Sequence, residues 1–79
     1  MFNHDAISAS LKGLGFSLIG SSQTGIYFNP VNGITAYWST YSMNKRNTRC
    51  YVFCKGMLRE EAFTENEITE KYFKLKSEL

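Results

Sequence analysis

The feature of the sequence that most restricts its fold is an Asn-Gly pair at residues 32–33 between two runs of strand-forming residues. Asn and Gly readily adopt the positive φ angles that a tight hairpin turn needs. The flanking residues 25–29 and 34–41 are rich in aromatic and β-branched side chains, which favour strands. We therefore predict an antiparallel hairpin whose turn lies at residues 30–33, Pro-Val-Asn-Gly.

A third strand is predicted at residues 49–55, Arg-Cys-Tyr-Val-Phe-Cys-Lys, after a polar loop at residues 42–48. Its β-branched and aromatic content favours pairing with residues 34–41. A short strand at residues 16–19 precedes a turn rich in Gly and Ser at residues 20–25. Residues 56–62 leave two interpretations open: an extension of the last strand with a bulge, or an irregular connection.

Two helices are predicted at the ends of the chain. Apolar residues recur at helical spacing over residues 5–14, and Gly13 and Gly15 then end the helix. Near the C-terminus, Thr64 followed by Glu67 has the spacing of a capping box, which predicts an N-cap at Thr64. The apolar stripe of this second helix consists of Ile68, Tyr72, Leu75 and Leu79.

These elements predict the α+β class, in the order helix, strands, helix. Seventy-nine residues suffice for one hydrophobic core, so residues 1–79 are expected to form a single domain. The expected architecture has two layers, with an antiparallel sheet of three or four strands and with the N-terminal and C-terminal helices on one of its faces. The opposite face of the sheet would then meet water.

Several functional classes are disfavoured. The first residues have no basic segment followed by an apolar run, and no apolar stretch is long enough for a membrane span, so we expect a cytoplasmic protein that does not contact membranes. Cys50 and Cys54 lie about 13 Å apart if both are on one strand, beyond the roughly 7 Å that a disulfide spans. With His4 as the one histidine, no zinc or catalytic motif is recognisable. We expect no metal, no cofactor and no enzymatic activity.

The formal net charge of +2 is unevenly distributed. Residues 1–59 contain six basic residues and one acidic residue, whereas residues 60–79 contain three basic and six acidic residues. So small a net charge does not by itself indicate a nucleic-acid binder. Lys45, Arg46 and Arg49 lie in or beside the predicted loop, where they either hold a phosphate backbone or are solvated like other charges at a hairpin tip.

Alternation along the strands assigns side chains to two faces. The face expected under the helices carries Ile26, Phe28, Ile34, Ala36, Trp38, Cys50, Val52 and Cys54. The face expected in water carries Tyr27, Asn29, Thr35, Tyr37, Ser39, Tyr41, Arg49, Tyr51, Phe53 and Lys55. Exposed aromatic and basic residues have the composition of binding hot spots. The alternative is that the rings serve only as stabilising cross-strand pairs.

The first interpretation predicts a binding site made of the aromatic and basic residues of that face and the adjoining loop. Its members are Tyr27, Tyr37, Tyr41, Lys45, Arg46, Arg49, Tyr51, Phe53 and Lys55. The leading hypothesis is a small non-enzymatic binding or inhibitory protein, of phage or mobile-element type, that docks a protein partner or its own copy. The alternative is a nucleic-acid-binding module in which the rings stack bases and the basic residues hold phosphates.

Residues 14–16, Leu-Gly-Phe, end the first predicted helix, and a strand and a hairpin follow up to residue 38. This stretch resembles the opening of HicA-type mRNA-interferase toxins. The resemblance covers under half the chain and implies a HicA-like RNase fold, but residues 21–28 contain no counterpart of that family's catalytic histidine. The order of helix, three strands and helix also resembles the double-stranded RNA-binding domain, although the last helix here opens with Glu-Asn-Glu rather than lysines.

Overall fold

The computed structural model describes residues 4–19, 25–43 and 46–79. In these residues two helices enclose five strands in sequence. The elements are α1 (His4–Gly13), β1 (Ser17–Ile19), β2 (Ile26–Phe28), β3 (Thr35–Met43), β4 (Arg46–Lys55), β5 (Leu58–Ala62) and α2 (Glu67–Ser77). The strands form one antiparallel sheet in the order β1-β2-β3-β4-β5. The predicted α+β class is confirmed, but the sheet in the described part of the chain has five strands instead of three or four.

The additional strand, β5, lies in the segment for which the sequence left two interpretations open. Lys55 at the end of β4 pairs with Leu58 at the start of β5, so a two-residue turn joins the strands. Gly56 in this turn has a φ of 60°, a conformation that costs glycine little and other residues more. The segment is therefore a regular hairpin and not a bulge or an irregular connection.

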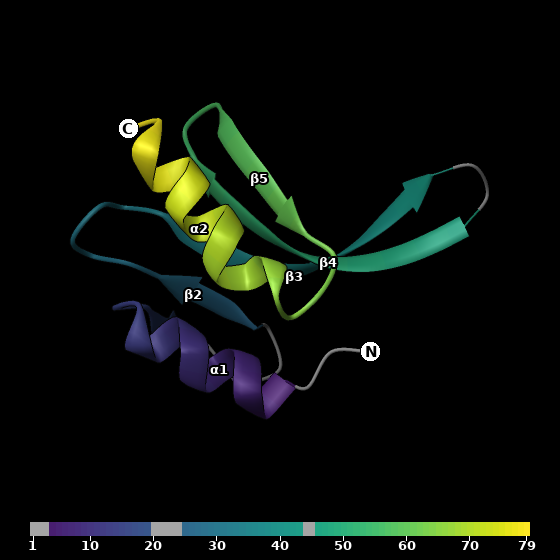
Figure 1. Cartoon of the computed structure of the whole chain (residues 1–79), viewed down its shortest axis with the longest axis horizontal. Helices are drawn as coiled ribbons and strands as arrows, with labels where there is room; N and C mark the ends of the chain where they lie inside the picture. Colours follow the sequence, from purple (N-terminus) through teal and green to yellow (C-terminus); the bar gives the residue numbers. More distant parts are fainter. Residues whose placement is uncertain (1–3, 20–24, 44–45) are drawn as a thin grey trace.

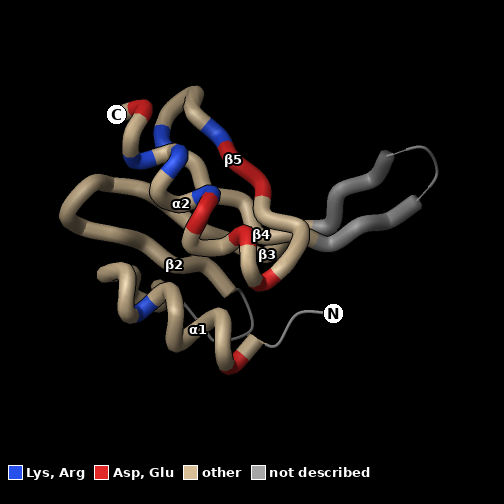
Figure 2. Tube along the Cα trace, in the orientation of Figure 1, with Lys and Arg blue, Asp and Glu red and all other residues tan. Residues whose placement is uncertain are grey.

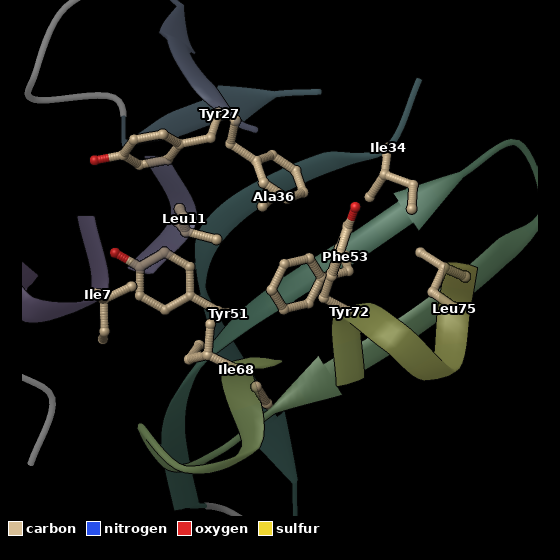
Figure 3. Packing of buried hydrophobic residues seen from close by; sticks show 12 residues of the cluster. Ile7, Leu11, Tyr27, Ile34, Ala36, Tyr51, Phe53, Ile68, Tyr72 and Leu75 are labelled. Atoms are coloured by element: carbon tan, nitrogen blue, oxygen red, sulfur yellow. The ribbon is translucent and has the colours of Figure 1, made fainter. Parts of the chain in front are cut away.

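Both helices pack on the same face of the sheet, so the domain has two layers (Figure 1). Figure 3 shows how α1 and α2 meet side chains of the central strands in one core. The helices contribute buried aliphatic and aromatic residues at helical spacing, as their sequence patterns predicted. The labelled core residues are Ile7, Leu11, Tyr27, Ile34, Ala36, Tyr51, Phe53, Ile68, Tyr72 and Leu75.

The predicted orientation of side chains is right for β3 and wrong for β2 and β4. Ala36 of β3 points toward the helices as expected, but Tyr27, Tyr51 and Phe53 lie beside it in the core, where Phe53 is 0% exposed. The register explains the error. Ala36 pairs with Tyr27 on one side and with Phe53 on the other, and directly paired residues share a face. Ile26, Phe28, Cys50, Val52 and Cys54 consequently lie on the opposite face.

Asn29 was also expected in water, yet it is 1% exposed. Its side-chain Nδ2 donates hydrogen bonds to the Leu14 carbonyl at 3.1 Å and to the Tyr72 hydroxyl at 3.4 Å. Its Oδ1 accepts a hydrogen bond from the Val31 backbone N–H at 3.0 Å. One buried amide therefore connects the end of α1, the β2–β3 loop and α2, which fixes both helices relative to the sheet.

Helix α2 begins later than the capping-box pattern predicted. It starts at Glu67 with Asn66 in the N-cap position, and Thr64 lies in the turn before it. The Glu67 carboxylate accepts hydrogen bonds from the Phe63 backbone N–H at 3.3 Å and from the Thr64 hydroxyl at 3.1 Å. The predicted pair does meet, but it stabilises the preceding turn, so Thr64 is not the N-cap.

The β3–β4 hairpin extends beyond the rest of the sheet (Figure 1). β3 pairs with β2 only through its own first two residues, Thr35 and Ala36, and β4 pairs with β5 only through residues 51–55. The β3–β4 pairing continues without these neighbours to Met43 and Arg46. Residues 39–43 and 46–50 thus form a two-stranded projection, which we call the ribbon.

Candidate functional site

The structure divides the predicted site residues among different surroundings. Tyr27, Tyr51 and Phe53 are buried under the helices, so they do not form a surface. Tyr37 is half-buried on the face of the sheet turned away from the helices, and Lys55 is exposed at the end of β4. Three of the remaining residues belong to the ribbon. The backbones of Tyr41, Arg46 and Arg49 lie in its strands, and Lys45 lies outside the described residues.

The face of the sheet turned away from the helices is called here the open face, and it carries two parallel rows of side chains. Each row takes one residue from every strand, as the registers of neighbouring strands require. The first row consists of Ile19, Ile26, Tyr37, Val52 and Glu61. The second row consists of Ser17, Phe28, Thr35, Cys54 and Arg59.

The open face changes character from β1 to β5. At the β1–β2 end, Ile19 is 44% exposed and Phe28 is 37% exposed. In the middle, Val52 is 0% exposed. At the β5 end, Arg59 Nε and Glu61 Oε1 form an ion pair at 3.2 Å. The open face is thus apolar over most of its width, with one pair of opposite charges at its rim.

Both cysteines lie on strand β4 as free thiols. Burial raises the pKa of the Cys50 thiol, the negative charge of Glu61 raises it further, and Arg59 partly offsets these effects. A buried thiol with a raised pKa stays protonated at neutral pH and is a poor nucleophile. Cys50 therefore acts as a small apolar side chain in the sheet.

Three aromatic rings meet at the N-terminal end of α1. The His4 Nδ1 atom and the Tyr51 hydroxyl are 3.3 Å apart, and the His4 ring packs edge-on against Trp38 with 4.9 Å between centroids. Burial raises the pKa of Tyr51 to about 12, with a smaller contribution from a charge on Tyr27. Because Tyr51 stays neutral at physiological pH, this cluster fits a structural contact between α1 and the sheet.

A similar bond attaches the middle of α1, where the Tyr27 hydroxyl donates to the Ser8 hydroxyl at 3.0 Å. Two of the tyrosines that the sequence pattern assigned to a binding face, Tyr27 and Tyr51, therefore contact α1 instead. The sequence prediction also missed most of the open-face residues, among them Ile26, Phe28, Arg59 and Glu61. The length of the β2–β3 loop could have identified Ile26 and Phe28. Four loop residues separate Asn29 from Ile34, so even-numbered residues of β2 pair with odd-numbered residues of β3 and share their face.

Acidic and basic residues occur together in the C-terminal part of the fold, where most of the acidic residues lie (Figure 2). Apart from Asp5 in α1, the acidic residues that the structure describes lie in β5, in α2 and in the segments next to them. Glu60 of β5 points toward α2, where its Oε1 lies 3.4 Å from the Lys74 Nζ atom. Glu61 is on the opposite face of the same strand, which places the Arg59–Glu61 pair on the open face.

No three His, Cys, Asp or Glu residues within residues 4–19, 25–43 and 46–79 are grouped so that they could hold a metal ion. In the same part of the chain, neither helix has the length and apolar character needed to cross a membrane.

The chain was compared with known proteins. No protein-family model, no curated protein and no solved structure matches it. The likeness to the double-stranded RNA-binding domain rested on three strands between two helices, and the five strands of the described chain do not have that order.

Proposed function

We propose that this protein is a non-enzymatic binding protein that docks a protein partner on the open face of its sheet. The observation that carries the proposal is the difference in covering between the two faces. Both helices pack on one face, while the other presents Ile19, Ile26, Phe28 and Tyr37 in partly exposed positions. Binding of a partner that removes these side-by-side apolar groups from water lowers the free energy of the system.

The distribution of polarity on the open face also fits a protein interface. Interface centres are depleted in charged residues and enriched in aromatic ones, and their rims are polar. On the open face the charges lie on the edge strand β5, at Arg59 and Glu61, while the strands β1 to β4 contribute apolar or neutral residues. A partner with an apolar centre and a charged rim would match this pattern.

The test compares two exposed phenylalanines on opposite sides of the molecule. Phe28 lies on the open face, and Phe73 lies on α2 with 49% exposure. Tagged wild-type protein, Phe28→Asp and Phe73→Asp are used to recover complexes from the source cell with and without nuclease. We expect a nuclease-resistant protein complex with wild type and Phe73→Asp that Phe28→Asp loses. Equal recovery with both variants, or loss of the complex on nuclease treatment, would contradict the proposal.

Binding to nucleic acid is the second candidate, and the ribbon is the observation that favours it. Two-stranded ribbons fit the major groove of DNA, and Lys45, Arg46 and Arg49 occur in or next to the ribbon. Base stacking on Tyr27, Tyr51 and Phe53 is no longer part of this candidate, because these rings are buried. The acidic residues of β5 and α2 oppose a nucleic-acid backbone, so we rank this function second.

Salt dependence distinguishes the two candidates. Neutralising three phosphates of a duplex gives a slope of about −3 for log affinity against log salt. We expect the protein to bind a labelled duplex no tighter than about 10⁻⁵ M at physiological salt, in the range of non-specific contact. A submicromolar complex whose slope flattens in Lys45→Ala/Arg46→Ala/Arg49→Ala would instead favour the nucleic-acid function.

A further inference from the structure

We infer that the partner that fits the open face is a second copy of this chain, related by a twofold axis that lies between two stacked sheets and runs across their strands. The inference rests on the proposed function and names the protein that would occupy the open face. It follows from the two rows of the open face, which the strand registers place side by side from β1 to β5. A homodimer of this kind uses the same patch on both subunits, so the patch must complement itself.

The twofold axis would run midway between the two rows. Rotation about such an axis reverses the strands but keeps β1 above β1 and β5 above β5, so the first row of one copy lies over the second row of the other. At the charged rim, Arg59 then faces Glu61 of the partner subunit, and Glu61 faces Arg59 of the partner subunit. Together with the Arg59–Glu61 pair within each chain, four charges of alternating sign would meet at the rim.

The other twofold axis that stacks two open faces runs along the strands, and it fits poorly. It would place β1 of one copy above β5 of the other, so the exposed Ile19 side chain would cover the charged Arg59–Glu61 pair. Removing an ion pair from water under an apolar side chain costs free energy that the attraction within the pair offsets only in part. The positions of the charges therefore select the axis that crosses the strands.

Side-chain size and polarity along the two rows agree with this choice. The large side chains of Ile19 and Tyr37 belong to the first row. In the dimer they would face the small polar side chains of Ser17 and Thr35 in the second row of the other copy. On β2, Ile26 faces Phe28 of the partner subunit, which is an apolar contact. Large residues opposite small ones allow two sheets to interlock at the usual separation of about 10 Å.

The area of the open face limits the affinity. Five strands spaced about 4.8 Å apart give a face about 24 Å wide. A face of this width with only two rows covers less than the roughly 800 Å² per partner of a standard stable interface. We therefore expect a weak, reversible dimer with a Kd on the order of 100 µM.

The experiment measures self-association of the full chain by sedimentation, from about 1 µM to about 1 mM, around the expected Kd. Arg59→Glu and Glu61→Arg each place like charges together at the rim, and each should weaken the dimer about tenfold because both symmetry-related contacts are lost. The combined Arg59→Glu/Glu61→Arg variant exchanges the charges, so it should restore the wild-type Kd. The matched control for Glu61→Arg is Glu70→Arg, which makes the same charge change at an exposed position on α2.

Circular dichroism of each variant establishes that the fold is kept, and Phe28→Asp with its control Phe73→Asp supplies a second test that does not depend on the charges. We expect Phe28→Asp to be monomeric and Phe73→Asp to dimerise like wild type. A combined charge variant that is weaker than both single variants, or a wild type that is monomeric throughout, would overturn the inference. If that monomer still needs Phe28 to bind a cellular protein, the proposed function stands; if it does not, both fail.

Discussion

The two faces of the sheet carry similar kinds of side chain, but the residues are used in different ways. On the face covered by the helices, Tyr27 and Tyr51 point their rings into the core and their hydroxyls contact Ser8 and His4 of α1. On the open face, Phe28 and Tyr37 keep part of their surface in water. The comparison teaches that an aromatic residue on a small sheet is not by itself a sign of binding. Its value as a sign depends on which face the strand register gives it.

The largest expected difference between the faces concerns two phenylalanines. Phe53 is 0% exposed in the core, whereas Phe28 is 37% exposed on the open face. Phe53→Ala should lower the free energy of unfolding by about 3–5 kcal/mol, because it leaves a cavity. Phe28→Ala should lower it by no more than about 1 kcal/mol, since less buried surface is lost. Urea unfolding of both variants checks this, and equal losses would mean that the two faces are not distinct.

A smaller effect is expected at Asn29, the buried amide that connects both helices with the β2–β3 loop. Asn29→Ala leaves buried hydrogen-bonding groups without their partner, which should cost about 1–3 kcal/mol of stability. Asn66→Ala is a suitable control, because Asn66 is exposed and its side chain makes no capping hydrogen bond. If urea unfolding shows equal effects for the two variants, the connection through Asn29 is not important for stability.

The smallest effect is a dependence on pH at Tyr51. Its pKa is raised from 10 to about 12, mainly by burial, so the folded protein keeps this proton at pH values where the unfolded chain loses it. The resulting contribution to stability is fully present below about pH 10 and is lost as the pH rises toward 12. Thermal melting of wild type and Tyr51→Phe should therefore converge over this interval. A difference in melting temperature between the two proteins that stays constant up to pH 12 would show that Tyr51 is not buried as described.

Much of the fold could be predicted from local patterns. The Asn-Gly loop indicated the β2–β3 hairpin, and the helical spacing of apolar residues identified both helices and most of the residues that they bury. Leu79, the last residue of the predicted stripe, lies beyond α2 and is 50% exposed. These signals are local, because a turn or an amphipathic helix is specified by residues close in sequence. Strand β5 was missed because residues 59–61, Arg-Glu-Glu, lack the apolar alternation typical of a strand.

The candidate site was harder to predict, because it depends on register. Side chains were assigned to faces strand by strand from their polarity, which put the more polar Tyr27 and Tyr51 in water. Their hydroxyls are satisfied by α1, a contact that the sequence of the sheet does not contain. The four-residue loop that separates Asn29 from Ile34 pairs odd with even residue numbers, and this parity places Tyr27 with Ala36. Side-chain polarity thus assigned the residues of β2 to the wrong faces, whereas the length of the loop predicts the observed pairing.

Docking of two copies through the open face can be tested by methyl NMR of the isoleucines on dilution. Ile19 and Ile26 lie on the open face, whereas Ile7 and Ile68 lie in the core under the helices. Between about 1 mM and about 20 µM, a range that spans a Kd of about 100 µM, we expect the methyl signals of Ile19 and Ile26 to shift while those of Ile7 and Ile68 stay fixed. Signals that are all independent of concentration, or shifts confined to Ile7 and Ile68, would contradict self-docking through the open face.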